Sequence, residues 1–349
     1  MSDGPAEPKP LHRRRPRYRG THPRRFDEKY KELAADRYPD LIVHVRAQGK
    51  TPAGQHRPIL VDEVLAALAP TAGDHGVDAT LGWGGHAEQI LPRLAPGGTL
   101  LGLDQDPIEL PRTEARLRNL GHAPEALLVR RTNFAGLRAA IDDVGWSEGA
   151  DFVFADLGVS SMQIDDPSRG FSFKHDGPLD MRMNPKRGLP AAEWLARVSV
   201  DELAAALRTH ADEPEANAIA EAIHARQGSL TTTRALASAV RDALDRRVTD
   251  EDADAAVRRV FQAVRIEIND ELGALDALLR TAPASLRAGG RIAVLTFHSG
   301  EDRRVKKAFE QGQRDGVYSE IATELVRVSQ AERRANPRAS SAKLRWARV

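Results

Sequence analysis

The residues best placed to do chemistry follow one strongly apolar segment in the middle of the chain. Residues 152–155 (FVFA) predict a buried β-strand that breaks at Asp156. The two dozen residues after it are rich in Ser, Gly, Asp and Arg. Open α/β sheets build their sites at the carboxyl ends of strands, and a loop of this length usually carries function. Residues 151–183 therefore predict a functional site, with a plain surface loop as the less favoured alternative.

A second group of residues predicts a nucleoside-binding site. Gly82, Gly84, Gly85 and His86 stand where a predicted strand turns into a helix, and Asp104 ends the next predicted strand. Glycines let the backbone approach a ligand, and a helix N-terminus offers free N–H groups. An acid about twenty residues further on typically binds ribose hydroxyls; the alternative for Asp104 is a helix N-cap. The spacing G-x-G-G does not match the dinucleotide fingerprint, which disfavours a nucleotide-dependent oxidoreductase.

The composition excludes several classes of protein. The chain has 349 residues, 41% of them hydrophobic, and no cysteine, so disulfides and thiolate metal sites are excluded. No His or carboxylate cluster has metal-ligand spacing, and we expect no metal. No apolar run approaches the ~18 residues of a membrane span, and the N-terminus lacks the apolar core of a secretory signal. We therefore expect a cytoplasmic protein without a membrane anchor.

The N-terminal region differs from the rest of the chain. Eight Lys or Arg residues and no acidic residue lie between Pro8 and Phe26, although the net charge of the whole chain is only +1. Residues 1–25 read as a disordered basic arm that attracts phosphate backbones without sequence selectivity, or as a solvated tail without a partner. Residues 26–48 could form a short helix and a strand.

From His56 onward, strands alternate with helices, as in a parallel sheet covered by helices on both faces. Four strands are expected, at the segment before Asp78 and within residues 98–106, 125–131 and 151–158, with helices at 62–70, 86–94, 109–121 and 134–145. The pattern changes at about residue 170. Three helices without a strand are expected at 194–210, 216–228 and 231–248, with an N-cap in the Thr231–Thr233 run.

The α/β pattern returns near the C-terminus. It predicts one long helix at 257–286, a strand at 289–297 and a helix at 299–311 that a capping box of Ser299 and Asp302 begins. Within the long helix, Arg265 and Asn269 lie one turn apart and could point at the cleft. The domains expected are therefore an extension (1–55), a first part of an α/β domain (56–169), a helical insertion (170–258) and a second α/β part (259–349).

Seven segments together closely resemble the bacterial small-subunit rRNA cytosine-N4 methyltransferases, the family called RsmH or MraW. From His56 to the C-terminus they run in the family's order: HRPILVDEVLAAL, DATLGWGGHAEQIL, GLDQDP, DLGVSSMQIDDPSRGFSFKHDGPLDMRMN, RRVFQAVRIEINDEL, GGRIAVLTFHSGEDRRVK and NPRASSAKLR. The long loop motif and NPRASSAKLR are far more specific than a glycine turn. Trp83 and Gly300 depart from the family's pattern, and residues 1–55 have no counterpart in its common core.

The resemblance implies a class I methyltransferase fold with an inserted helical domain that recognises the substrate. It also implies S-adenosylmethionine (SAM) as methyl donor and a cytidine in the decoding region of 16S rRNA, within the small ribosomal subunit, as target. Carried over position by position, the SAM contacts would be Gly84, Gly85, His86, Asp104, Phe134, Asp156 and Gln163. Phe134 ends the third predicted strand, where it could flank an adenine ring or pack in the core.

The reaction so implied assigns roles to a few more side chains. The cytosine N4 amine is a weak nucleophile, and Asp156 could accept its hydrogens, while Ser160 and Asp180 are further candidates for gripping the base. The target base must leave its stack to be reached. Arg169, Lys174, Arg182, Lys343 and Arg345 are the candidates for phosphate contacts.

Three alternatives stay open at this point. One is a methyltransferase of the same fold that acts on another RNA position, or on DNA, although the usual motif of DNA amino-methyltransferases is absent. Another is a catalytically weak rRNA-binding assembly factor. The oligomeric state, including a homodimer, does not follow from the sequence.

Overall fold

The computed structural model describes residues 58–244 and 248–349. The predicted basic arm, and the helix and strand expected at residues 26–48, lie outside these residues. The described strands form one sheet in the order β3-β2-β1-β4-β5-β8-β6, and β7 also pairs with β8. Their bounds are β1 His75–Asp78, β2 Thr99–Asp104, β3 Leu127–Arg131, β4 Ala150–Asp156, β5 Leu286–Thr296, β6 Glu320–Ile321, β7 Val326–Arg327 and β8 Lys343–Arg348.

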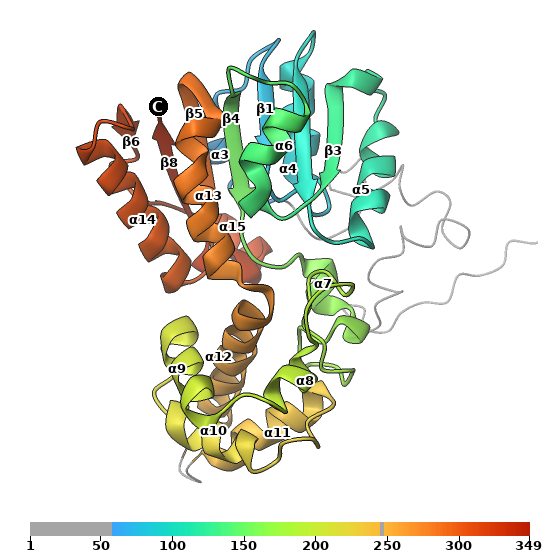
Figure 1. The fold of residues 1–349 in the computed structure, drawn as a ribbon, viewed down its shortest axis with the longest axis vertical. Coiled ribbons are helices and arrows are strands. Elements are labelled where there is room, and N and C mark those ends of the chain that lie inside the picture. Colours follow the sequence, from blue (N-terminus) through green and yellow to red (C-terminus); the bar gives the residue numbers. More distant parts are fainter. Residues whose placement is uncertain (1–57, 245–247) are drawn as a thin grey trace, which may run out of the picture. The chain divides into compact units, whose positions relative to one another are not determined.

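Strands β1 to β5 run parallel, and β8 runs antiparallel to β5. Strands β1 and β4 are neighbours, so the chain winds outward in one direction from β1 and in the other from β4 (Figure 1). Open α/β sheets bind ligands where the strand order reverses in this way, in a crevice at the carboxyl ends of the two strands, here β1 and β4. The arrangement is the class I methyltransferase fold, and it confirms the predicted α/β class with a mostly parallel sheet.

Each face of the sheet has its own apolar layer. Because side chains alternate along a strand, Val153 and Ala155 of β4 join one layer and Phe152 and Phe154 join the other. The first layer packs against α6 (Leu137–Asp143), α13 (Glu271–Ser285) and α14 (Ser299–Arg314). The second packs against α3 (Val61–Leu68), α4 (Gly85–Leu94) and α5 (Glu109–Arg118). The expectation of helices on both faces is confirmed.

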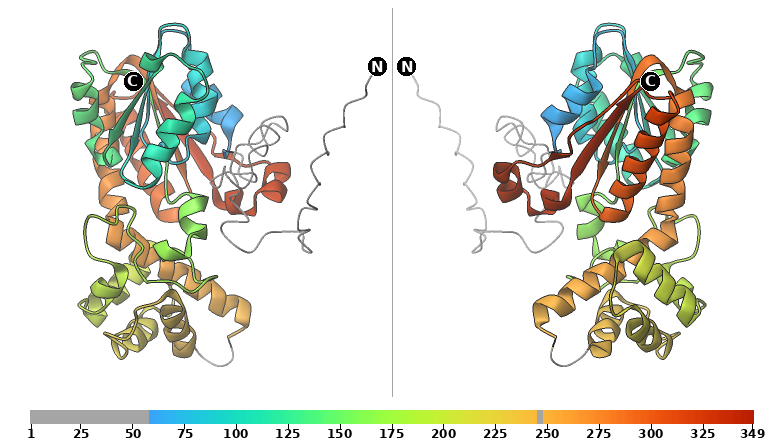
Figure 2. Two further views of the ribbon diagram at one scale, coloured as in Figure 1. Left: turned by 90° about the vertical axis from the view of Figure 1, so that its right-hand side faces the viewer. Right: turned by 90° about the vertical axis from the view of Figure 1, so that its left-hand side faces the viewer.

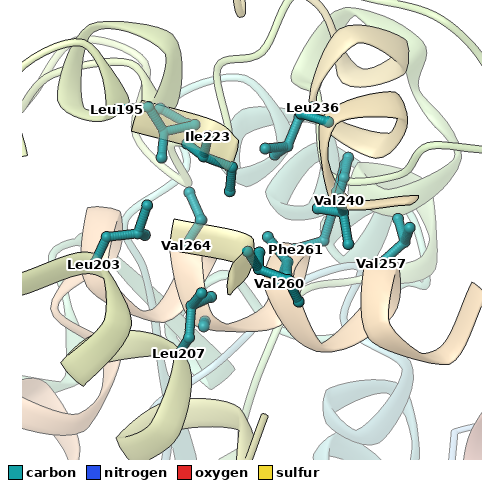
Figure 3. Close-up of a cluster of buried hydrophobic side chains, with 14 of the residues drawn as sticks. Leu195, Leu203, Leu207, Ile223, Leu236, Val240, Val257, Val260, Phe261 and Val264 are labelled. Carbon is teal, nitrogen blue, oxygen red and sulfur yellow. The ribbon is translucent and has the colours of Figure 1, made fainter. Parts of the chain in front are cut away.

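A separate helical cluster follows β4 in the chain (Figure 1). Its helices are α8 (Ala191–Leu195), α9 (Val200–Ala211), α10 (Ala216–His224), α11 (Thr233–Ala243) and α12 (Asp250–Asn269). Figure 3 shows the apolar side chains at its centre, among them Leu203, Ile223, Leu236, Val260 and Phe261. Thr232 caps α11 by accepting a hydrogen bond from the Ala235 amide at 3.2 Å, as the Thr run predicted.

Two predicted helices are each divided. The helix expected at 194–210 is two helices, because the Ser199 hydroxyl and Glu202 form a capping box that begins α9. The helix expected at 257–286 breaks at Asp270, which adopts a left-handed conformation with φ of 48°. That break separates α12 from α13 and turns the chain from the helical cluster back to the sheet.

The start of α14 also differs from the prediction. His298 is its N-cap, and the Glu301 carboxylate accepts hydrogen bonds from the amides of Phe297 (2.8 Å) and His298 (3.3 Å). The predicted capping box of Ser299 and Asp302 is therefore wrong. Asp302 instead binds Lys343 and Arg345 on β8, a strand that the sequence pattern did not predict.

Candidate functional site

The glycine turn between β1 and α4 is held against the end of β2. Gly82 and Gly84 adopt positive φ angles of 49° and 76°. The Gly82 amide donates to the Asp104 carboxylate at 2.8 Å, and the Gly82 carbonyl accepts from the Thr113 hydroxyl at 2.6 Å. A side chain at Gly84 would start 3.0 Å from Thr113 and Leu117. The predicted glycine requirement thus has a structural reason, which is a left-handed turn pressed onto α5.

Trp83 is accommodated within this turn. Its ring lies under the guanidinium of Arg116, 5.2 Å from the ring centroid. Arg116 also donates to the Trp83 carbonyl and pairs with Glu88 at 2.6 Å. The departure from the family pattern therefore leaves the turn supported by α5.

The sequence left two roles open for Asp104, ribose binding and capping of the next helix. In the structure, Asp104 and Asp106 are each suited to one of them. The Asp104 carboxylate accepts from the amides of Gly82 and Asp106, both at 2.8 Å, and burial raises its pKa to about 6. The helix cap is Asp106, which accepts from the amides of Ile108 (2.8 Å) and Glu109 (3.3 Å) at the start of α5. Asp104 is thus left with lone pairs for a ligand such as a ribose.

Asp156 ends β4 beside the glycine turn, and its carboxyl group is poorly satisfied. Its amide donates to the Thr80 hydroxyl at 2.6 Å, whereas its Oδ1 is buried without a hydrogen-bond partner in the described structure. About 30% of the side chain remains accessible. Burial, with the nearby carboxylates Asp78 and Glu301, raises the pKa of Asp156 to about 8. Asp156 is therefore mostly protonated at neutral pH when no cation is bound.

His86 is the group nearest to this carboxyl. Its Nε2 lies 2.9 Å from the Ile59 carbonyl, which can only accept a hydrogen bond, so Nε2 carries the proton of the neutral ring. Burial lowers the pKa of His86 to about 4. The unprotonated Nδ1 then faces Asp156 Oδ2 across 3.6 Å. The pair is two neutral groups rather than an ion pair.

The loop after β4 is fastened to the sheet through Asp106. Gln163 and Arg169 both donate to Asp106 Oδ2 at 2.8 Å. Gln163 Oε1 also accepts from the Ser160 amide at 2.9 Å, and the Ser160 hydroxyl accepts from the Gln163 amide at 3.2 Å, which begins α7 (Ser161–Asp165). Gln163 and Ser160, both predicted as site residues, therefore lie together at the end of β2.

Further along the loop, Asp180 and Arg182 bind each other. Two hydrogen bonds from the Arg182 guanidinium, of 2.7 and 2.8 Å, reach the Asp180 carboxylate. Burial alone would raise the pKa of Asp180, but the hydrogen bonds and charge of Arg182 lower it. Asn269 at the end of α12 donates to the Met181 carbonyl at 2.8 Å and accepts from the Met183 amide at 2.7 Å. Asn269 thus positions the loop between these residues.

The predicted phosphate contacts fall into different environments. Lys174 is exposed, and Arg182 is partly engaged with Asp180. Lys343 and Arg345 share Asp302, at 2.9 and 2.7 Å. Arg169 is only 7% exposed, and its guanidinium binds Asp106 and the carbonyls of Arg182 and Met183. That position does not support a phosphate contact for Arg169, because its donors already hold the loop.

The remaining predicted residues lie around the same end of the sheet. Gly85 begins α4 beside Pro58, which a side chain at Gly85 would contact at 2.8 Å. Phe134 is half-buried after β3 and packs against the apolar layer of α6 and α13. Arg265, expected to point at the cleft, is bound by Glu271 through two hydrogen bonds of 2.8 and 2.9 Å.

Three contacts that the sequence analysis missed organise the site. The Thr80 hydroxyl accepts a hydrogen bond from the Asp156 amide. Asp106 holds the loop by its hydrogen bond from Arg169, and Arg338 pairs with Asp165 at 2.6 Å. The motifs GLDQDP and NPRASSAKLR contain two of these residues, but nothing in a single sequence says what they bind. In residues 58–244 and 248–349, no three His, Asp or Glu side chains gather as a metal ion would require. Over the same residues, no helix is long and apolar enough to cross a membrane.

Comparison with known proteins agrees with this architecture. The model of the MraW methylase family matches residues 53–349. Ribosomal RNA small subunit methyltransferase H 2 of Alkaliphilus metalliredigens is 49% identical over 96% of this chain and 97% of its own length. Ribosomal RNA small subunit methyltransferase H 1 of Lachnoclostridium phytofermentans is 47% identical over 97% of this chain and 93% of its own.

These alignments add to what was expected of the N-terminal extension. Residues 1–55 make up about a sixth of the chain, so alignments that cover 96 or 97% of it must include most of them. The extension therefore has counterparts in these two relatives. The family model begins only at residue 53, so the extension lies outside the family's common core, as expected.

Among solved structures, a SAM dependent methyltransferase from Aquifex aeolicus aligns over 92% of this chain and 97% of its own, at 10% identity and a TM-score of 0.38. That likeness is too distant to bear on function. The family model, which matches more than half of the chain, and the two relatives are decisive: the chain belongs to the MraW methylase family.

Proposed function

We propose that this protein transfers a methyl group from S-adenosylmethionine to the exocyclic N4 amine of a cytidine in the decoding region of 16S rRNA. The family and the names of its relatives, which are small-subunit rRNA methyltransferases, support the reaction and the substrate. The structural observation that carries the proposal is Asp156, a carboxyl at the end of β4 with a buried oxygen that has no partner in the described structure.

The residues at the crevice fit SAM. The Asp104 carboxylate has lone pairs to accept hydrogen bonds from ribose hydroxyls, and the left-handed Gly82–Gly84 turn brings the backbone close to the ligand. We propose that Gly84, Gly85, His86, Asp104, Phe134, Asp156 and Gln163 surround the cofactor. When bound, SAM supplies a methyl group that its positive sulfonium has already activated. The remaining task of the protein is to align the acceptor with it.

Asp156 and its neighbours can handle the amine hydrogens. A cation close to a buried carboxyl lowers its pKa, so a positively charged cofactor favours the ionised form of Asp156. Asp156 in that form can accept a hydrogen bond from N4 and later a proton. His86 cannot compete as a cation, because burial holds its pKa at about 4. Ser160 and Asp180 are proposed to hold the base from the loop after β4.

We propose that the helical cluster recognises the RNA. It has an apolar core of its own, and α12 joins it to α13 through the bend at Asp270. The core extends to Val264, past the boundary first expected at residue 258, so the change of domain is better placed at Asp270. Lys174 and Arg182 lie on the loop that enters this cluster and remain the proposed phosphate contacts there.

Nucleoside mass spectrometry of small-subunit rRNA tests the proposal in cells. A strain that lacks this gene should lose N4-methylcytidine, and the wild-type gene should restore it. An unchanged nucleoside profile would contradict the proposal. Because a bare loop offers few phosphate anchors, we expect purified small subunits to be methylated faster than naked rRNA, and equal rates would exclude that part.

A further inference from the structure

A group of arginines near the C-terminus lies at the edge of the sheet where the crevice opens. In the register of the sheet, Arg327 of β7 is paired with Lys343 of β8. Lys343 in turn is paired with Thr296, the last residue of β5. Since β5 is parallel to β4, Arg327 stands at the carboxyl edge of the sheet, in line with the strand ends that carry the candidate site.

The short helix α15 (Gln330–Ala335) brings two more arginines to this edge. Glu332 of α15 accepts a hydrogen bond from the Leu60 amide at 2.9 Å. The preceding residue, Ile59, accepts the hydrogen bond from His86. Arg333 and Arg334 directly follow Glu332. Their helix is therefore linked to His86 through two hydrogen bonds, one between Glu332 and Leu60 and one between Ile59 and His86. Figures 1 and 2 place α15 at the same end of the sheet as α7.

The positive charge of these arginines is not neutralised within the described part of the protein. Arg327, Arg333 and Arg334 are exposed, and no ion pair of the described residues involves them. Like charges on directly opposite strand residues repel, as Arg327 and Lys343 do. The carboxylate that binds Lys343, that of Asp302, is shared with Arg345. Most surface arginines on α5 and α6 differ, since Arg112, Arg118 and Arg138 each pair with an acid on their own helix.

We propose that Arg327, Arg333 and Arg334 form a docking surface for the phosphates of the RNA strand that flanks the target base. The inference rests on the proposed function, and it adds a contact surface to the basic residues named above. Guanidinium groups bind phosphate oxygens through paired hydrogen bonds. Such contacts position a nucleic acid without reading its sequence. A solvated surface without a partner is the competing interpretation, and the salt dependence of RNA binding separates the two.

The test compares two triple variants of the full-length protein. The first is Arg327→Gln, Arg333→Gln and Arg334→Gln. The matched control is Arg280→Gln, Arg314→Gln and Arg348→Gln, which removes three exposed arginines from the opposite edge, near the start of β5. Affinity for a single-stranded fragment of the target rRNA is measured over a salt series, and methylation kinetics are measured on small subunits. Unchanged SAM affinity verifies that each variant is folded.

We expect the first variant to bind RNA more weakly and with a flatter salt dependence. Each lost phosphate contact should reduce the slope of log K against log salt by about 0.7, so three contacts reduce it by about 2. The KM for subunits should rise while kcat at saturation is kept, and the control should match the wild type.

If the first variant has the same salt slope and KM as the wild type, the proposed docking surface is wrong and the proposed function is unaffected. A wild-type protein that binds the fragment but methylates nothing would overturn the proposed function, and the salt slope would still decide on the docking surface. A wild-type protein that binds no RNA would overturn both.

Discussion

Strand β4 has one aspartate near each end, and the two side chains have different partners. At the amino end, Asp151 Oδ2 accepts a hydrogen bond from the His75 amide at 2.7 Å, and Oδ1, which is buried without a hydrogen bond in the described structure, forms an ion pair with Arg287. Burial raises the pKa of Asp151, but the charge of Arg287 lowers it. At the carboxyl end, Asp156 has no cation beside it, and one of its oxygens is buried without a partner in the described structure. Burial raises the pKa of Asp156 to about 8 and that of nearby Asp78 to about 7.

The difference indicates that the carboxyl end of β4 lowers the stability of the fold. A buried carboxyl that has neither a cation nor a full set of hydrogen bonds costs free energy, because burial disfavours its charge and nothing offsets that cost. The charge of Asp151 has a partner in Arg287, so structure alone explains it, whereas no Lys or Arg of the described residues pairs with Asp156, which leaves room for a cationic ligand. This contrast is the central claim of our account.

The largest expected effect comes from exchanging each aspartate for asparagine. Asp156→Asn should lower the methyl-transfer rate roughly 100-fold or more, since it removes the group that we propose as proton acceptor at the reacting amine. Asp151→Asn should keep near wild-type activity but should lower the free energy of unfolding, because it weakens the pair with Arg287. Steady-state kinetics and urea unfolding of both variants measure this. An Asp151→Asn variant as inactive as Asp156→Asn would break the comparison.

The second effect concerns the loop that carries Ser160 and Asp180. Arg169→Met leaves the buried Asp106 carboxylate without its ion pair and should cost about 3–5 kcal/mol of unfolding free energy, with loss of activity. The control is Arg130→Met, which removes a pair to Asp143 whose partners are 40% and 60% exposed. That change should cost less than about 1 kcal/mol. Equal losses in urea unfolding would contradict the role of Arg169 in holding the loop.

The third effect is a pH dependence of cofactor affinity. Without ligand, the pKa of Asp156 is about 8, so only a minority of the protein molecules have an ionised Asp156 at neutral pH. A cationic cofactor should bind to that ionised form. Binding should release a proton, and affinity should fall by up to about tenfold per unit as the pH drops below 8. Isothermal titration in buffers of different ionisation enthalpy measures both. Asp156→Asn should flatten the profile, and a wild-type affinity independent of pH would rule the mechanism out.

The same pKa fixes the sign of a stability change. In the unfolded chain an aspartate titrates near 3.9. Because the folded pKa is higher, Asp156 contributes stability that is present below pH 4 and is lost as the pH rises to about 8. Asp156→Asn should therefore become more stable than the wild type as the pH increases over this window.

The smallest effect is expected at the tie between the C-terminal segment and α7. Arg338 pairs with Asp165 at 2.6 Å, with 33% and 16% of the two side chains exposed. Arg338→Asp should raise the KM for RNA several-fold by loosening α7, with a stability cost of about 1 kcal/mol. Adding Asp165→Arg should restore part of the loss. A double variant no better than the single would show that Arg338 acts on something other than Asp165.

Local sequence patterns predicted most of the fold. The alternation of apolar segments and glycine turns gave β1 to β5 and their helices, because period and turn chemistry are local. The divisions at Ser199 and Asp270 were missed: a capping box inside a helical pattern and a single left-handed residue barely change the apolar periodicity. The antiparallel β8 was missed as well, since its apolar residues are interrupted by Lys343 and Arg345.

The candidate site, like the fold, could be predicted from the sequence only in part. The positions of Asp104, Asp156 and the glycines could be predicted because each ends a strand or makes a turn. The roles of Asp106, Arg169 and Arg338 could not, because each depends on a partner 57 or more residues away in the chain. Arg169 illustrates the limit: its charge suggested phosphate binding, and only its burial reveals that it holds the loop.

The most direct test of the central claim is an analysis of the methylated product. Small subunits from a strain that lacks this gene are incubated with methyl-labelled SAM and purified wild-type, Asp156→Asn or Asp151→Asn protein, and the rRNA is digested to nucleosides. We expect labelled N4-methylcytidine with the wild type and Asp151→Asn, and almost none with Asp156→Asn. Label in another nucleoside, or equal label with Asp156→Asn, would contradict it.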